Sequence, residues 1–257
     1  MVVSQILIYP VKSFDGVAVR EATITPGGFL EGDRIYALFD AENKYVNAKR
    51  TPRIQLLRAE FDSRYEHVVL SKPENGGPRS FSLIEPAELN AWLSEFFGFP
   101  IFVKKETTSG FPDDRAAPGP TIVSEASLGE VTTWYPGLSV ESARRRFRTN
   151  LELSGTEPFG EDRLFGLPEE KRPFRVGDVR FLGHNPCQRC VVPTRDPDSS
   201  DPIQNFQKTF MEMRKKTLPP WSQPLRFNHY YRFAINTSIP ESETGRVLRV
   251  GDEVRLE

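Results

Sequence analysis

The sequence has 257 residues, of which 38% are hydrophobic and 27% are charged, and its formal net charge is −1. These values are typical of a soluble globular protein with one large or two small domains, and they disfavour nucleic-acid binding, which usually requires a basic face. No apolar stretch approaches the ~20 residues of a membrane span and the N-terminus lacks the basic segment of a signal peptide, so we expect a cytoplasmic protein with no membrane span.

Short strands separated by turns dominate the first hundred residues. Strands are predicted over residues 2–9, 17–25, 32–40, 45–46, 54–61, 65–70 and 101–104, with a turn over 74–78. One helix is predicted over residues 86–98, because apolar residues recur there at the spacing of one helical face and Gly98 suits the C-cap. We therefore expect a mainly β protein with a few helices, of the α+β class.

A segment rich in Gly, Pro, Asp and Ser, residues 107–120, is the predicted boundary between two domains, 1–110 and 111–257. Beyond it, Ser124 is expected to cap a helix that begins at Glu125. Arg144 and Arg145 are assigned to a solvated face, and a strand is predicted to follow near Leu151. The remaining predictions are Gly-Asp turns at 177–178 and 251–252, a helix over 206–216, and strands over 227–235 and 247–256.

Both cysteines lie in one short stretch, residues 183–194, together with His184. Two cysteines cannot build a disulfide framework, which favours a reducing compartment. Cys187 and Cys190 have the C-x-x-C spacing of a redox dithiol, but flanking prolines and valines disfavour the helix N-terminus that such pairs usually occupy. Zinc bound by His184 and both thiols would lack a fourth ligand. A single thiolate holding a soft metal and two inert cysteines are the other interpretations.

The residues around the second cysteine carry a family resemblance. The run Arg189-Cys190-Val191-Val192-Pro193-Thr194, followed by Asp196-Pro197, resembles the signature of the MOSC family, the molybdenum cofactor sulfurase C-terminal domain. Four further segments are similar to the family in the same order: Tyr9 to Ser13, Asp33-Arg34, Ser124 to Leu128, and Arg146 to Gly155. The resemblance therefore spans nearly the whole chain.

The resemblance implies an N-terminal β-barrel-like domain followed by a MOSC β-barrel domain, as in the amidoxime reducing components. It implies a molybdenum–pterin cofactor of the molybdopterin type between the domains, with Cys190 as the catalytic residue and metal ligand. The implied cofactor-binding residues are Lys12, Ser13, Arg34, Ser127, Arg148, Asn150 and Arg189. The implied activity is two-electron reduction of N-hydroxylated or similar N-oxygenated small molecules. At the family level the resemblance also includes pyridoxal phosphate binding.

Electrons for such a reaction are expected from a separate donor protein. No glycine-rich nucleotide loop follows a predicted strand, and two cysteines leave no ligand set for an iron–sulfur cluster. Gln188 stands where the family often has Ser, which puts the substrate range or a cofactor hydrogen bond in question. Two alternatives stay open: a sulfur carrier or sulfurtransferase that uses a Cys190 persulfide, and a cofactor carrier without turnover.

Overall fold

The computed structural model describes residues 1–72 and 76–257, and it confirms a mainly β protein with a few helices. The strands are β1 (Val2–Ile8), β2 (Val17–Val19), β3 (Glu21–Thr23), β4 (Tyr36–Phe39), β5 (Tyr45–Val46), β6 (Arg58–Phe61), β7 (His67–Lys72), β8 (Gly76–Ser82), β9 (Phe102–Lys105), β10 (Ile122–Ser124), β11 (Leu151–Ser154), β12 (Arg172–Val176), β13 (Val179–Gln188), β14 (Arg232–Ser238), β15 (Val247–Arg249) and β16 (Val254–Leu256). The helices are α1 (Ala87–Phe97), α2 (Glu125–Thr133), α3 (Val140–Phe147) and α4 (Phe206–Lys216). Five short 3-10 helices are also present in the described residues: η1 (Pro52–Leu56), η2 (Gly160–Leu164), η3 (Val192–Thr194), η4 (Pro224–Arg226) and η5 (Glu241–Glu243).

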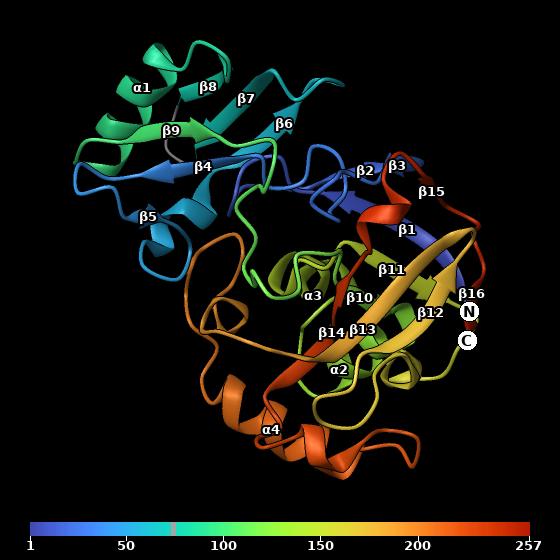
Figure 1. Cartoon of the computed structure of the whole chain (residues 1–257). Coiled ribbons are helices and arrows are strands. Elements are labelled where there is room, and N and C mark those ends of the chain that lie inside the picture. The colour runs from blue at the N-terminus through green and yellow to red at the C-terminus, as the bar shows by residue number, and fades with distance from the viewer. Residues whose placement is uncertain (73–75) are drawn as a thin grey trace.

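An eight-stranded sheet forms the frame of the larger lobe, which we define as β1–β3, β10–β16 and α2–α4 (Figure 1). Its strand order is β16-β12-β13-β14-β10-β11-β1-β2. Strand β1 pairs antiparallel with β11, placing Ile6 opposite Leu151, and β10 runs parallel to β11 on its other side. The first strand of the chain thus lies inside a sheet built mostly from its second half.

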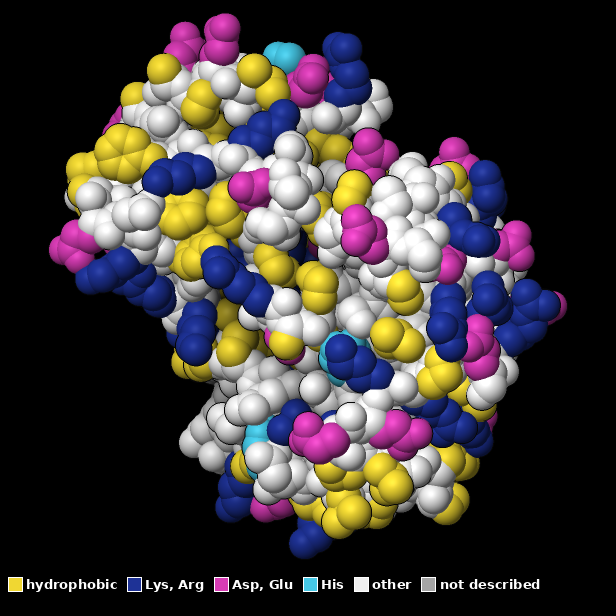
Figure 2. Space-filling view, viewed as in Figure 1, with side chains coloured by type: hydrophobic (Ala, Val, Ile, Leu, Met, Phe, Trp, Pro, Cys, Tyr) yellow, Lys and Arg dark blue, Asp and Glu magenta, His cyan; other side chains and the backbone are white. Residues whose placement is uncertain are grey.

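The smaller lobe contains β4–β9 and α1 (Figure 1). Two three-stranded sheets, β5-β4-β9 and β6-β7-β8, share a core with the apolar face of α1, on which Leu89, Trp92, Leu93 and Phe96 are buried. This core runs from Val11 to Val103 and takes one residue from far along the chain, Val192. On the face shown in Figure 2, basic and acidic side chains are interspersed over both lobes.

Several predicted elements are confirmed at nearly their predicted bounds. Helices α1 and α4 form as expected, and Gly98 ends α1 in the left-handed conformation. The Ser124 hydroxyl accepts a hydrogen bond from Ser127 N at 3.1 Å, which confirms the predicted N-cap of α2. Gly177-Asp178 forms the two-residue turn between β12 and β13, with Val176 paired to Val179. Of the predicted turn over 74–78, residues 74 and 75 lie outside the described residues.

Other predictions were wrong in their bounds. The strand expected from residue 54 begins at Arg58, because Pro52 opens the 3-10 helix η1 instead. The strand expected from residue 32 begins at Tyr36, since Gly32 and Arg34 adopt positive φ and form a turn. The strand expected from residue 227 begins at Arg232.

Helix α3 was not predicted. Ser139 caps it by accepting a hydrogen bond from Ser142 N, Glu141 lies in its first turn and three arginines lie in its last turn. These charges complement the helix dipole and are the sequence signal for it.

The boundary segment carries no helix or strand between residues 106 and 121. Strands β1 and β2 nevertheless belong to the large sheet, while the residues from β4 to β9 build the smaller lobe. The division into residues 1–110 and 111–257 stays a prediction. Among the described residues, none of the helices combines the length and the apolar character needed to cross a bilayer.

Candidate functional site

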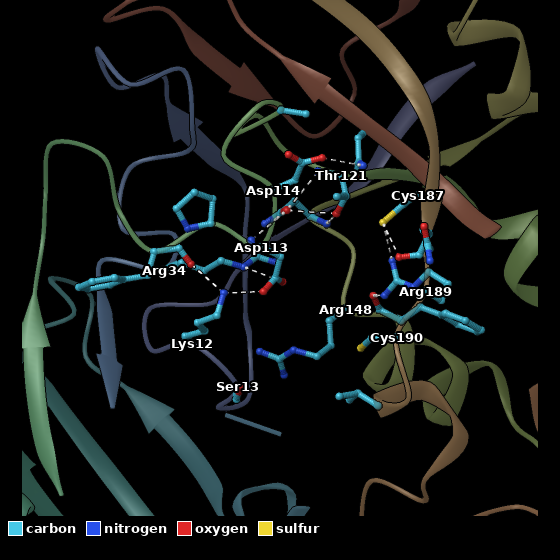
Figure 3. Close-up of a pocket in the computed structure, with 18 of the residues that line it drawn as sticks. Lys12, Ser13, Arg34, Asp113, Asp114, Thr121, Arg148, Cys187, Arg189 and Cys190 are labelled. Atoms are coloured by element: carbon cyan, nitrogen blue, oxygen red, sulfur yellow. Dashed lines mark hydrogen bonds and ion pairs between the residues drawn. The ribbon is translucent and has the colours of Figure 1, made fainter. Parts of the chain in front are cut away.

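A pocket of about 720 Å³ lies where the boundary segment, the β1–β2 connection, the end of α3 and the end of β13 meet. Figure 3 shows the side chains that project into it. Of the residues implied by the family resemblance, it brings seven together: Lys12, Ser13, Arg34, Arg148, Asn150, Arg189 and Cys190. These residues come from segments far apart in the sequence, so the pocket exists only in the complete fold.

Lys12 is a nearly buried cation on one wall of the pocket, with 9% of its surface exposed. Its Nζ donates to the backbone oxygen of Phe111 at 3.0 Å and pairs with Asp113 Oδ1 at 2.5 Å. Burial lowers the pKa of Lys12, and the Asp113 carboxylate opposes that shift. Burial pushes the pKa of Asp113 upward, but Lys12 and Arg34 outweigh it and lower that pKa to about 2. The Asp113 carboxylate is therefore ionised at neutral pH and can pair with Lys12.

The Arg34 side chain is hydrogen-bonded to buried polar residues of the protein. Its guanidinium pairs with Asp33 and donates to Asn150 Oδ1 at 3.3 Å. Asn150 is 1% exposed, and its amide nitrogen donates to Leu7 O and to Asp33 Oδ1. Its oxygen also accepts from the backbone and hydroxyl of Thr121. Because all of its polar groups are used within the protein, Asn150 orients Arg34 rather than offering a free contact.

Arg148 is a half-buried cation of the pocket that forms no ion pair within the described residues. It ends α3 in the left-handed conformation, with φ of 52°, and its guanidinium carbon lies 4.3 Å from the centre of the Tyr9 ring, which Arg34 also approaches, at 5.3 Å. Within residues 1–72 and 76–257, its side chain makes no hydrogen bond or ion pair. Burial lowers the pKa of Arg148, so an anion placed beside it would be favourable.

Three of these pocket residues share an uncommon backbone geometry. Ser13, Arg34 and Arg148 all have positive φ, at 74°, 52° and 52°. Side chains other than Gly adopt this region at a cost, and such residues concentrate at functional sites. At Ser13 the hydroxyl also accepts a hydrogen bond from Ala48 N at 3.2 Å, which fixes it against the smaller lobe.

Both thiols reach the pocket on the opposite side from Lys12. In the view of Figure 3 the Arg148 side chain lies between Lys12 and Cys190. Cys187 lies in β13 and is half-buried, whereas Cys190 follows the end of the strand and is exposed; both are free. Arg189 donates to Cys187 Sγ at 3.3 Å and to Phe147 O at 2.5 Å, while its buried Nε has no hydrogen-bond partner among the residues that the structure describes.

His184 does not join the thiols. Its Nε2 lies 2.7 Å from the Ser238 hydroxyl. In the part of the chain that the structure describes, no three His, Cys, Asp or Glu residues come together in a way that could hold a metal ion. The zinc interpretation therefore has no ligand set there.

Ser127 lies away from the pocket. The side chain is fully buried, donates to Glu161 Oε2 at 2.8 Å and accepts from Phe159 N at 2.6 Å. The structure does not bring Ser127 to the other implied residues, and its cofactor contact stays a prediction. Instead, Ser127 belongs to the support of α2 and η2, where burial raises the pKa of Glu161 to about 7.

The sequence interpretation missed the acidic and amide residues of the pocket. Asp113 and Asp114 come from the boundary segment, and Asn185 and Asn236 come from the neighbouring strands β13 and β14. Asn236 donates to Asn185 at 3.1 Å. The sequence signal that could have found Asp113 and Asp114 is their adjacency within a Gly/Pro-rich segment. A flexible connection does not need carboxylates, so their presence indicates another role.

Comparison with known families covers both parts of this arrangement. The MOSC N-terminal beta barrel domain matches residues 1–83, and the MOSC domain matches residues 119–255, including Arg148, both cysteines and the β13–β14 wall. The chain belongs to the MOSC domain family.

Three relatives show how far the similarity of this MOSC chain extends. The mitochondrial amidoxime-reducing component 1 of Homo sapiens is 26% identical, over 99% of this chain and 82% of its own length. The mitochondrial amidoxime reducing component 2 of Rattus norvegicus is 27% identical, over 77% of this chain and 67% of its own length. The molybdenum cofactor sulfurase of Oryza sativa subsp. japonica is 22% identical, over 97% of this chain; the chain spans only 35% of that protein.

Proposed function

We propose that this protein binds a molybdenum–pterin cofactor and uses it to reduce N-hydroxylated or similar N-oxygenated small molecules. The observation that carries the proposal is Arg148: a guanidinium that makes no ion pair within the described residues lies in the same pocket as the exposed thiol of Cys190. An unpaired guanidinium calls for an anion, and a free thiol is a soft ligand. A phosphate-bearing group with a soft metal satisfies both.

The donor set agrees with the phosphate end of such a group. Lys12, Arg34 and Arg148 line the pocket together; Lys12 pairs with Asp113, which is 76% exposed, and Arg34 pairs with Asp33, while Arg148 has no ion pair within the described residues. Arginine is suited to phosphate because its fork donates to two oxygens at once. Asn150 and Asp33 would hold Arg34 in place for that contact.

The thiol end agrees with a metal ligand. Cys190 Sγ would bind the metal as a thiolate, while Arg189 is held by Phe147 O and Cys187. When bound, the cofactor supplies a metal that exchanges two electrons with the substrate. Reduction of an N-hydroxyl group consumes two electrons and two protons, breaks the N–O bond and releases water. A separate protein would deliver the electrons.

The test is to produce the protein in a host able to make the cofactor and to measure molybdenum, pterin and amidoxime reduction with a chemical electron donor. We expect about one molybdenum per chain, by the one-thiolate stoichiometry of the site, and turnover of the amidoxime. Protein that carries neither molybdenum nor pterin would contradict the proposal.

A second candidate function is sulfur transfer by a Cys190 persulfide. It is favoured by the exposure of this thiol and by similarity to proteins named molybdenum cofactor sulfurase. Intact-mass measurement separates the two functions. A persulfide on Cys190 without bound molybdenum would favour sulfur transfer, whereas bound cofactor without turnover would favour a carrier.

A further inference from the structure

Four charged residues form a closed ring beside the pocket: Asp15, Arg58, Arg145 and Asp198. The distances are 3.2 Å from Arg58 Nη1 to Asp15 Oδ1, 3.3 Å from Arg58 Nη2 to Asp198 Oδ1, 2.8 Å from Arg145 Nη1 to Asp198 Oδ1, and 4.0 Å from Arg145 Nη2 to Asp15 Oδ1. We call this set the ion-pair ring. Arg145, expected on a solvated face, is thus part of a network, and its hydrogen bond lowers the pKa of Asp198.

Each half of the pocket is attached to the ring through the chain. Asp15 follows directly on the segment that carries Lys12 and Ser13, and Arg145 lies in α3, which ends at Arg148. Asp198 lies on the segment that leaves Cys190. The ring therefore joins the three segments that carry Lys12, Arg148 and Cys190.

The segment that leaves Cys190 lies between the two lobes. On one side, Val192 belongs to the core of the smaller lobe, and Arg195 and Ser200 donate to the backbone oxygens of Ala48 at 2.6 Å and Pro52 at 3.0 Å. On the other side, the buried Arg146 donates to Pro193 O at 3.1 Å and pairs with an aspartate of the same segment. This segment can move relative to the cations only if these contacts change.

Arg58 makes the ring more than a set of surface pairs. Its guanidinium also donates to Pro197 O at 2.5 Å, to Gln55 O at 2.8 Å and to Leu57 O at 3.0 Å. Asp15 in turn accepts from the backbone of Ala59 at 3.1 Å. Isolated exposed ion pairs contribute little to stability. A planar guanidinium that donates to several fixed acceptors, however, fixes the positions of the segments that carry them.

We propose that the ion-pair ring sets the position of the Cys190 thiol relative to Lys12, Arg34 and Arg148, with Arg58 and Asp198 as its positioning residues. Neither side chain lines the pocket, so both act through the backbone that they hold. The inference rests on the proposed function for its consequence in the reaction. Its structural part concerns the thiol alone and can be tested without a cofactor.

The test measures iodoacetamide alkylation of Cys190, by peptide mass spectrometry, with Cys187 on β13 as the internal reference. The variants are Arg58→Met, Asp198→Asn, the double variant, Asp198→Glu and the control Arg64→Met. The Arg64 side chain is 77% exposed and, among the described residues, forms one ion pair, with Glu66. In Arg58→Met and Asp198→Asn we expect the Cys190-to-Cys187 rate ratio to rise at least about threefold, because the segment is released. The double variant should match the singles, and Asp198→Glu should restore the original ratio.

The dependence of the alkylation ratio on salt is a second measurement. It would not change if Arg58 and Asp198 acted through packing rather than through their charges. Raising the ionic strength from about 0.05 to 1 M screens partly exposed charges, so it should raise the ratio in the original protein and leave the ring variants unchanged. In cofactor-loaded protein, the same variants should keep their pterin and lose about tenfold or more in kcat, because misplacement of reacting groups is costly.

Two results would overturn the inference. One is an alkylation ratio in Arg58→Met and Asp198→Asn equal to that of Arg64→Met. The other is a salt response that persists in the ring variants. If the original protein carries no cofactor while the alkylation ratio changes as expected, the proposed function fails and the ring stands.

Discussion

The side-chain amide of Asn150 donates to the carboxylate of Asp33 at 3.1 Å, and the other oxygen of that carboxylate holds Arg34. This relationship joins the end of α3 to the turn before β4 through buried polar atoms. It separates two roles that the family resemblance treats alike. Arg148 and Lys12 present positive charge to the pocket, whereas Asn150 holds Asp33 and Arg34 in position.

Replacing Asn150 by Ala should therefore act first on stability. The change removes the hydrogen bonds that Asn150 donates to Leu7 O and to the buried Asp33 carboxylate, which keeps Tyr9 N and Arg34 as donors, so we expect a loss of roughly 2–4 kcal/mol in the free energy of unfolding. Asn185→Ala is the matched control, since within the described residues its side chain makes a single hydrogen bond, to Asn236, and it should cost less than about 1 kcal/mol. Urea unfolding followed by fluorescence measures both. Equal costs in the two variants would contradict the supporting role.

Replacing Arg148 by Gln should weaken anion binding and leave the fold stable. Its guanidinium makes no bond within the described residues, and one charge-assisted bond to phosphate contributes roughly 1.5–3 kcal/mol, or about 10- to 100-fold in affinity. Calorimetric titration with pyrophosphate measures this loss. Pterin content after purification provides an independent measure.

Arg144→Gln is the contrasting variant for Arg148. Arg144 forms a bidentate pair with the fully buried Glu152, at 2.6 and 2.8 Å. Its removal should cost about 3–5 kcal/mol in stability, because a buried charge loses its partner, while pyrophosphate affinity is kept. Unchanged affinity in Arg148→Gln would place the anion site elsewhere.

The two cysteines should differ sharply. Cys190→Ser should abolish reductase activity, since a hydroxyl is a harder and much less acidic ligand than a thiol. Cys187→Ala should keep molybdenum and most of the activity, because its sulfur is engaged by Arg189 rather than exposed. Metal analysis and amidoxime reduction measure both. Equal loss would revive the dithiol mechanism, in which one sulfur attacks and the other resolves.

Glu161 should make stability depend on pH. Burial, with Asp162 beside it, raises its pKa from 4.5 to about 7 in the folded protein. Between these values the unfolded chain is ionised while the folded one keeps its proton, so the contribution of Glu161 is complete below pH 4.5 and is lost as the pH rises to about 7.

Glu161→Gln should remove this dependence, which amounts to roughly 3 kcal/mol at most. The variant should gain stability over the original protein as the pH rises from 5 to 8, in about that window. Glu157→Gln, at a surface residue paired with Arg163, serves as the control and should show no such gain. Thermal unfolding across the pH range measures both. A parallel pair of curves for Glu161→Gln and the original protein would show the prediction to be wrong.

Pure protein should not turn over an amidoxime with NADH alone. The sequence has no glycine-rich nucleotide loop after a strand and only two cysteines, so it offers neither a nucleotide site of that kind nor an iron–sulfur ligand set. Steady consumption of NADH in the absence of any other protein would contradict this expectation.

Local sequence patterns predicted the parts of the fold that local physics determines. The apolar spacing of α1 and the Ser124 cap are complete within a dozen residues, so both could be read from the chain. The pairing of β1 with β11 could not, because nothing in residues 2–8 specifies which distant strand will lie beside them. The same holds for the contact of Val192 with the core of the smaller lobe.

The pocket shows the same limit at the level of side chains. Motif resemblance selected Arg148 and Ser127 on equal terms, yet Arg148 lines the pocket and Ser127 is fully buried within α2. Which way a side chain points depends on the turn that carries it, here the left-handed residue at the end of α3. Asp113 escaped notice because its partner, Lys12, lies about a hundred residues earlier in the chain.

The place of β1 in the large sheet also governs the order in which the molecule can be completed. Ser4 and Glu152, which are bonded across the β1–β11 pair, are 148 residues apart in the chain. At a synthesis rate of about 5–20 residues per second, β1 leaves the ribosome roughly 7–30 s before its partner strand exists. During that interval the residues from Val11 to Val103 can already assemble the core of the smaller lobe, while the apolar side of β1 must wait uncovered. During early translation, the first ten residues are therefore the part of the chain that most needs protection from aggregation.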